Sequence, residues 1–188
     1  MKNRKSPVGQ YIIEGIGDTD DAYEYVEELL PLIGEVVLFF NSLESDIDHL
    51  ICEDISDRTD RKGLLVLHNM MYGTKVDLYE RFKSEELRIC GWSLPSFKDL
   101  ISNLRECGTL RNRVVHANWQ YTNDEGYTHV RFNMGKEGLE HELLQFSVES
   151  LERIVQKIID ARDAIEGFEE ELQEKHYEWQ RDIEKRRE

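Results

Sequence analysis

Turn-forming residues are sparse in this chain, with only 12 glycines and three prolines among 188 residues. A fold built from many short strands needs frequent turns, and turns draw heavily on these two residues. Apolar residues instead recur three and four positions apart over long stretches, which places them along one side of a helix. The sequence therefore predicts a mostly helical protein with a core large enough to need no disulfide or metal.

The helix boundaries follow from prolines and capping residues. Proline suits the first turn of a helix, which places new helices at Pro31 and Pro95, and Ser147 is a suitable N-cap for the last one. The expected helices cover 22–30, 31–54, 60–83, 95–118 and the chain from 147 onward.

One segment before the last helix has a different pattern. Tyr121 and Tyr127 flank the turn sequence Asn123-Asp124-Glu125-Gly126, which predicts a short β-hairpin within 119–138. We expect a flexible tail over 1–19, one helical domain over 20–172, and a charged, exposed end of the last helix over 173–188.

The net charge of −15 argues at first against nucleic acid, which favours basic surfaces. The acids, however, are concentrated near the beginning: 14–60 contains 15 acids and one base. The stretch 61–136 contains 12 bases and eight acids. The objection therefore applies to the first helices and not to this later region.

The cysteines and the longest apolar run suggest where the protein resides. Cys52, Cys90 and Cys107 form no CxxC pair and read as reduced thiols of a cytoplasmic protein. The longest apolar run, 36–40, is too short to cross a membrane. No zinc-binding spacing is present, so we expect neither a metal nor another cofactor.

One motif stands out near the end of the helix expected over 95–118. Arg111 and His116 point about 140° apart on an ideal helix, whereas Asn112 and His116 share one side of it. A polar row continues back from these through Thr109 to Arg105. Gly108 in the same row suggests the close approach of a second helix, for which Glu44 is a possible polar neighbour. The alternative is that the helix dipole alone favours Arg and His at this end.

This stretch resembles the HEPN superfamily, whose signature is an arginine, a polar residue and a histidine several positions later. Arg111, Asn112 and His116 match it, while 38–44 resembles the first-helix pattern F-x-x-L-E and 71–76 a second-helix segment containing Lys75. The resemblance implies an all-α, up-and-down bundle of four to five helices, with the hairpin before the last helix as an addition.

Catalytic members of this superfamily are metal-independent endoribonucleases that act as homodimers with composite sites. The resemblance implies that His116 transfers a proton, Arg111 holds the scissile phosphate and Asn112 orients one of them. The expected RNA contacts are Arg105, Arg113 and Lys75. The alternative for Arg113 and Lys75 is that they are ordinary surface cations. Glu44 and Thr109 are expected to support the site.

The resemblance also implies a role in a toxin–antitoxin pair or in phage defence, with an antitoxin or another protein as a possible partner. Asn118 stands where some members carry an adenylylated tyrosine, so that regulation is not expected. The alternative function is a non-catalytic helical dimer that binds a protein or a nucleotide. The acidic first third and the charged last helix motivate this alternative.

Overall fold

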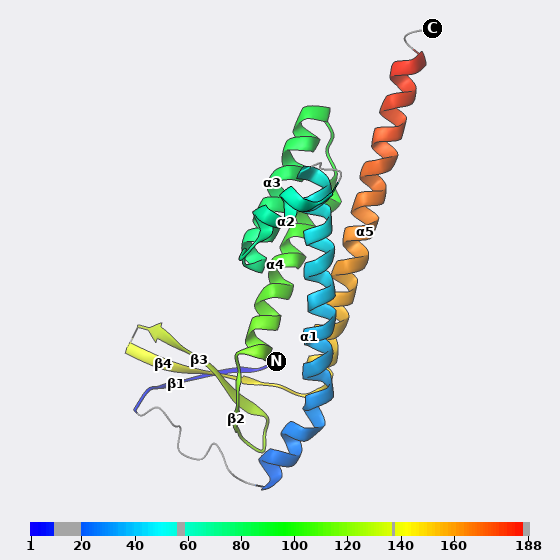
Figure 1. Cartoon of the computed structure of the whole chain (residues 1–188). Helices are drawn as coiled ribbons and strands as arrows, with labels where there is room; N and C mark the ends of the chain where they lie inside the picture. The colour runs from blue at the N-terminus through cyan, green and yellow to red at the C-terminus, as the bar shows by residue number, and fades with distance from the viewer. Residues whose placement is uncertain (10–19, 56–58, 137, 186–188) are drawn as a thin grey trace. The chain divides into compact units, whose positions relative to one another are not determined.

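The computed structural model describes residues 1–9, 20–55, 59–136 and 138–185, and in these it contains five helices and a four-stranded antiparallel sheet (Figure 1). In chain order the elements are β1 (Asn3–Pro7), α1 (Asp20–Ile55), α2 (Arg61–Leu67), α3 (Tyr72–Cys90), α4 (Pro95–Val115), β2 (Asn118–Thr122), β3 (Tyr127–Gly135), β4 (Gly138–Gln145) and α5 (Val148–Lys185). The mostly helical character is confirmed, but the sheet makes the fold α+β and the all-α prediction too narrow.

Two helix boundaries differ from the prediction. Helix α1 continues through Pro31, although proline lacks the N–H that would bond to the preceding turn. Leu29 and Val36, on either side of it, are both buried, so one continuous apolar side outweighs the local cost. The helix expected over 60–83 is instead divided into α2 and α3, with Asn69 in the left-handed region at φ 60° between them.

The predicted hairpin is confirmed as β2 and β3. The backbone N–H of Tyr127 donates to Asn123 Oδ1 at 2.8 Å across the turn. Gly126 has φ 79°, and a Cβ there would lie 2.6 Å from the carbonyl oxygen of Phe146. Glycine is therefore required at this position by both conformation and space.

The sheet extends beyond the predicted hairpin, in the order β1-β4-β3-β2. Strand β4 pairs along the whole of β3, and β1 pairs with β4 from Asn3 opposite Leu144 to Pro7 opposite Glu140. The flexible tail predicted over 1–19 therefore has to be corrected for its first residues, while residues 10–19 lie outside the described part. Nearly every β1 side chain is exposed, so no apolar alternation marked it as a strand.

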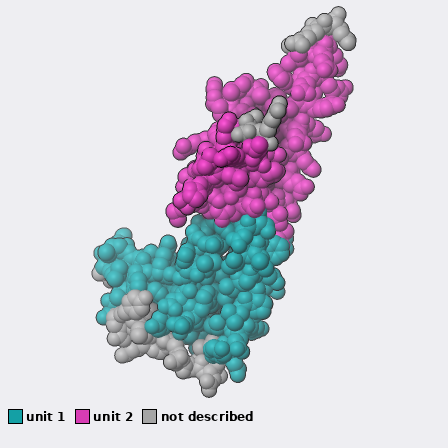
Figure 2. Space-filling model, in the orientation of Figure 1, with its two compact units in different colours: residues 1–42, 107–158 teal, residues 43–106, 159–188 magenta. Residues whose placement is uncertain are grey.

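The chain forms two compact units (Figure 2), and the single domain expected over 20–172 remains a prediction. Unit 1 comprises 1–42 and 107–158, and unit 2 comprises 43–106 and 159–188. In unit 1 the sheet packs with the ends of helices, and its buried core includes Val36, Phe40, Val114, Leu143, Phe146 and Leu151. The core of unit 2 includes Leu43, Ile47, Val76, Leu104 and Phe168.

Helix α5 extends through the end of the described chain. Residues 173–185 are helical and mostly exposed. Within the described ranges, no helix is both long enough and apolar enough to cross a membrane.

Candidate functional site

The candidate motif lies where α4 ends and the chain turns toward β2. Arg111 and Asn112 belong to the last turns of α4, and His116 is the first residue after it. The His116 backbone N–H still donates to the Asn112 carbonyl at 3.1 Å, which holds the first residue of the turn close to the helix. Its side chain is exposed and has no hydrogen-bonding partner within the described ranges.

Trp119 fixes the direction in which the chain leaves α4. Its indole Nε1 donates to the Val114 carbonyl at 3.0 Å, and its ring centroid lies 4.9 Å from that of Phe146. This satisfies one of the carbonyls that a helix C-terminus leaves unpaired. The anchored turn holds His116 at a defined place relative to Arg111.

The Arg111 guanidinium rests on an aromatic ring of α1. Its Cζ lies 5.3 Å from the centroid of Phe40, and its Nη1 donates to Asn112 Oδ1 at 3.1 Å. Its Nε is buried and has no hydrogen-bond partner in the part of the chain that the structure describes. An unpaired buried donor is costly, about 1–3 kcal/mol. The side chain is therefore held by the ring and by a neutral amide.

The charge of Arg111 is not balanced by a carboxylate among the described residues. Three other arginines contrast with it: Arg105 Nη2 lies 2.9 Å from Asp77 Oδ1, Arg131 Nε lies 2.6 Å from Glu142 Oε2, and Arg162 Nε lies 2.6 Å from Asp46 Oδ2. In a chain of net charge −15, such a guanidinium is a favourable place for an anion.

Arg111 and His116 occupy different sides of the end of α4. Arg111 is half-buried against α1, while His116 faces solvent. This fits the wide angle expected from the sequence spacing. A single phosphate could contact both side chains of one chain only by reaching around the end of α4. In a dimer, the arginine of one copy and the histidine of the other could contact the same phosphate.

Lys75 and Glu44 lie in unit 2, where they form a closed cluster. Lys75 Nζ lies 2.8 Å from Glu44 Oε1 and 2.8 Å from Asp48 Oδ2, and Lys75 is buried. Burial lowers the pKa of Lys75, but hydrogen bonds with Asp48 and Glu44 outweigh it and the net pKa is raised. Its ammonium therefore stays charged and is already paired.

The remaining expected contacts have different surroundings. Arg105 is engaged by Asp77 and Glu80 in unit 2, and these hydrogen bonds raise its pKa. Thr109 is exposed on α4, and Arg113 is half-exposed in its last turn with no ion pair among the described residues. Of the expected RNA-binding cations, Arg113 is thus the one whose charge is not already paired.

Sequence reasoning did not identify Phe40 as part of the site. Phe40 fits the apolar side of its helix, and nothing in its spacing indicates which side chain of another helix would cover it. The signal that points to it, the guanidinium above its ring, exists only once α1 and α4 are packed together.

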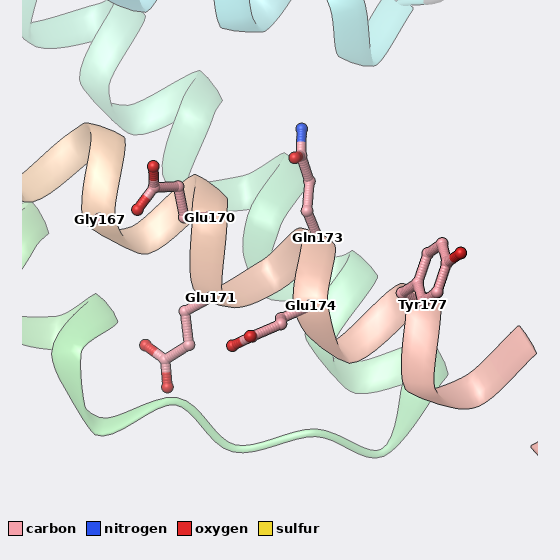
Figure 3. Close-up of a pocket in the computed structure, with 6 residues that line it drawn as sticks. All are labelled: Gly167, Glu170, Glu171, Gln173, Glu174 and Tyr177. Atoms are coloured by element: carbon pink, nitrogen blue, oxygen red, sulfur yellow. The ribbon is translucent and has the colours of Figure 1, made fainter. Parts of the chain in front are cut away.

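A hollow elsewhere in the molecule has the wrong charge for a phosphate. It measures about 560 Å³ and is lined by α5 residues of unit 2, namely Gly167, Glu170, Glu171, Gln173, Glu174 and Tyr177 (Figure 3). Its three glutamates would repel an anion. The described residues also contain no cluster of three or more His, Cys, Asp or Glu arranged to hold a metal ion.

The chain was compared with models of protein families, with characterised proteins and with solved structures, and none of the three comparisons finds a match.

Proposed function

We propose that this protein is a metal-independent endoribonuclease of the HEPN type that acts as a homodimer. The observation that carries the proposal is the Arg111 guanidinium, which lacks a carboxylate partner among the described residues and lies close in sequence to the exposed His116. The accessible imidazole provides a proton-transfer group, and the uncompensated guanidinium provides a phosphate-binding group.

The reaction needs no group beyond these side chains. The ribose 2′-oxygen attacks the adjacent phosphorus, the new O2′–P bond forms and the P–O5′ bond breaks. The 2′-hydroxyl proton passes to a neutral imidazole, and a second, protonated imidazole donates a proton to the leaving 5′-oxygen. The guanidinium stabilises the charge that develops on the phosphoryl oxygens. The products carry a 2′,3′-cyclic phosphate and a 5′-hydroxyl.

The geometry of this reaction supports a dimer. The attacking and leaving oxygens lie on opposite sides of the phosphorus, so one imidazole cannot serve both at once. Among the residues that the structure describes, one chain offers a single exposed histidine close in sequence to Arg111, namely His116. A second copy would supply the other imidazole and a second guanidinium.

A defence or toxin role, controlled by an antitoxin or another protein, is the biological setting that this activity supports best. Free ribonuclease activity is harmful to the cell that makes it, so a partner that masks the site is expected. The acidic stretch 14–60 offers a surface for a basic partner.

The test is cleavage of varied single-stranded RNAs by purified protein in EDTA. We expect wild type to cut, and both His116→Ala and Arg111→Ala to abolish cutting. His68→Ala is the matched control because His68 is likewise exposed but lies in unit 2. Undiminished cleavage by His116→Ala would remove the catalytic assignment. A dimer that cuts none of the RNAs would instead indicate the non-catalytic binding function.

A further inference from the structure

We propose that Phe40 is a positioning residue for Arg111, an inference that rests on the proposed ribonuclease function. Phe40 belongs to α1 and is 2% exposed, so the surrounding core holds its ring rigidly. The guanidinium of Arg111, from α4, lies over this ring at 5.3 Å. Both residues belong to unit 1. The ring sets where the guanidinium lies without taking part in the reaction.

An aromatic ring positions a guanidinium without cancelling its charge. The ring attracts the cation through its quadrupole and brings no net charge of its own. Arg131 shows the contrasting arrangement in the same unit, because its Nε lies 2.6 Å from the buried Glu142 carboxylate. An arginine held by a carboxylate is much less available to an anion. Phe40 therefore holds Arg111 and leaves its charge for the phosphate.

The contacts also determine which part of the guanidinium remains for a ligand. Nη1 already donates to Asn112 Oδ1, and Nε is buried beneath neighbouring atoms. Nη2 has no hydrogen-bond partner among the described residues. The geometry therefore presents Nη2 and the second N–H of Nη1 to a phosphate oxygen, with Phe40 and Asn112 fixing the plane of the fork.

The first experiment is a kinetic double-mutant cycle. Phe40→Leu keeps an apolar side chain but removes the π face, and we expect kcat to fall about tenfold with little change in KM. Phe40→Tyr keeps the ring face and should have a kcat close to that of wild type. Phe39→Leu, the neighbouring phenylalanine on α1, is the matched control and leaves kcat unchanged. In an Arg111→Lys background, where residual activity is measurable, Phe40→Leu should lower kcat by a much smaller factor.

The second experiment reads the position of Arg111 without any activity. The Nε–H of Arg111 is shielded from solvent, so its ¹⁵N–¹H resonance should be observable and is identified by its absence in Arg111→Lys. We expect this N–H to exchange faster with solvent in Phe40→Leu, because the guanidinium is no longer held in its shielded position, and to exchange at the wild-type rate in Phe39→Leu. An exchange rate that is unchanged in Phe40→Leu would overturn the inference.

The two experiments separate this inference from the proposed function. If exchange of the Arg111 Nε–H is faster in Phe40→Leu but wild type cuts no RNA in EDTA, the ribonuclease proposal fails and the placement of Arg111 by Phe40 stands. If wild type cuts RNA but Phe40→Leu reduces kcat equally in wild type and in Arg111→Lys, Phe40 contributes to packing alone and the positioning role is lost.

Discussion

The charge of Arg111 is the feature on which the site depends. Its neighbours are the ring of Phe40 and the side-chain amide of Asn112, both neutral. Lys75, Lys83 and Arg105, by contrast, each contact two or more carboxylates. A phosphate would therefore gain most from the guanidinium of Arg111.

Arg111→Lys tests whether the planar fork matters in addition to the charge. Lysine keeps one positive charge but loses the paired N–H groups and the flat face that rests on Phe40. We expect kcat for RNA cleavage to fall about 10²–10³-fold, as for removal of a transition-state donor. Steady-state kinetics on one defined RNA measures this. A variant as active as wild type would mean that a point charge is sufficient.

His116→Ala tests whether the histidine serves chemistry alone. Because the side chain is exposed and makes no side-chain contact among the described residues, its loss should change the free energy of unfolding by less than about 0.5 kcal/mol. Cleavage should disappear while thermal unfolding, followed by circular dichroism, stays the same. A large drop in Tm would assign His116 a structural role instead.

One buried carboxylate of β4 adds side-chain links to the backbone pairing of three strands. Glu142 is 3% exposed and accepts hydrogen bonds from Arg131 Nε at 2.6 Å, Asn133 Nδ2 at 2.6 Å and Asn3 Nδ2 at 2.9 Å. It thereby links β1 and β3 to β4. Burial raises the pKa of Glu142, but these hydrogen bonds outweigh it and lower the pKa to about 2.

This carboxylate makes the stability of the sheet depend on pH. Because the pKa of Glu142 is lower in the folded state, its contribution is complete above the ordinary glutamate value of 4.5 and is lost as the pH falls toward 2. Glu142→Gln should lower stability by about 1–3 kcal/mol near neutral pH. The variant should also lose less stability than wild type below pH 4.5, as measured in acid titrations followed by circular dichroism. An unchanged acid profile would contradict this role.

A histidine pair on the sheet makes its stability depend on pH in a second, higher range. The rings of His129 and His141 lie 5.3 Å apart, and burial together with His141 lowers the pKa of His129. The fold therefore favours neutral His129. Its contribution is complete above the ordinary value of 6.5 and declines as the pH falls below it. His129→Gln should remove the loss of stability below pH 6.5 from the same acid titration. If that loss persists, another group causes it.

Pro31 is a local weakness within α1. Proline in a helix interior removes one backbone hydrogen bond and crowds the preceding turn, at a cost of about 3 kcal/mol. Since Pro31 is exposed, Pro31→Ala changes no core contact and should raise the free energy of unfolding by up to this amount. Thermal or urea unfolding measures the change. A less stable variant would show that the helix requires a bend here.

The sequence predicted most helices, but it placed a break at Pro31 that does not exist and missed the one between α2 and α3. Periodicity gives the apolar sides of α1, α4 and α5 directly, because each side packs as one stripe. The continuity at Pro31 and the interruption between Leu67 and Tyr72 depend on tertiary packing, which overrides local preference. Strand β1 carries no apolar pattern, because backbone pairing and the side chain of Asn3 hold it to β4.

The candidate site was predictable in part, since the spacing of Arg111, Asn112 and His116 is visible in the sequence. The partners of the surrounding charges were not, because Lys75 meets Glu44 and Asp48 across a large separation in sequence. The same holds for Phe40 beneath Arg111. Contacts of this kind depend on how helices pack, whereas motifs depend on order along the chain.

The net charge of −15 for the whole chain raises the question of where the proposed RNA substrate would bind. The contact should be local to unit 1, at the uncompensated Arg111. Each phosphate contact on single-stranded RNA contributes about −0.7 to the slope of log K against log salt. Arg111→Ala should therefore reduce that slope by about this amount per site, measured with a non-cleavable 2′-O-methyl RNA.

The control for this measurement is Arg81→Ala, because Arg81 is an exposed arginine of α3 in unit 2. The slope of log K against log salt measured for this variant should equal that of wild type. If both variants lowered the slope equally, binding would be a diffuse property of the surface and not of one site.

Dimerisation is the remaining expectation for the molecule as a whole. Light scattering in solution should give twice the 22.2 kDa of one chain. Mixing inactive His116→Ala with inactive Arg111→Ala chains should restore part of the activity, because a composite cleft can combine an intact residue from each copy. A monomeric mass, or no recovery on mixing, would contradict the shared site.

The most direct measurement is the chemistry of the RNA ends produced in EDTA by wild type and by His116→Ala. The account predicts that wild type produces 2′,3′-cyclic phosphate and 5′-hydroxyl ends and that His116→Ala produces none. Products with a 5′-phosphate and a 3′-hydroxyl, or cyclic phosphate formed equally by both proteins, would contradict it.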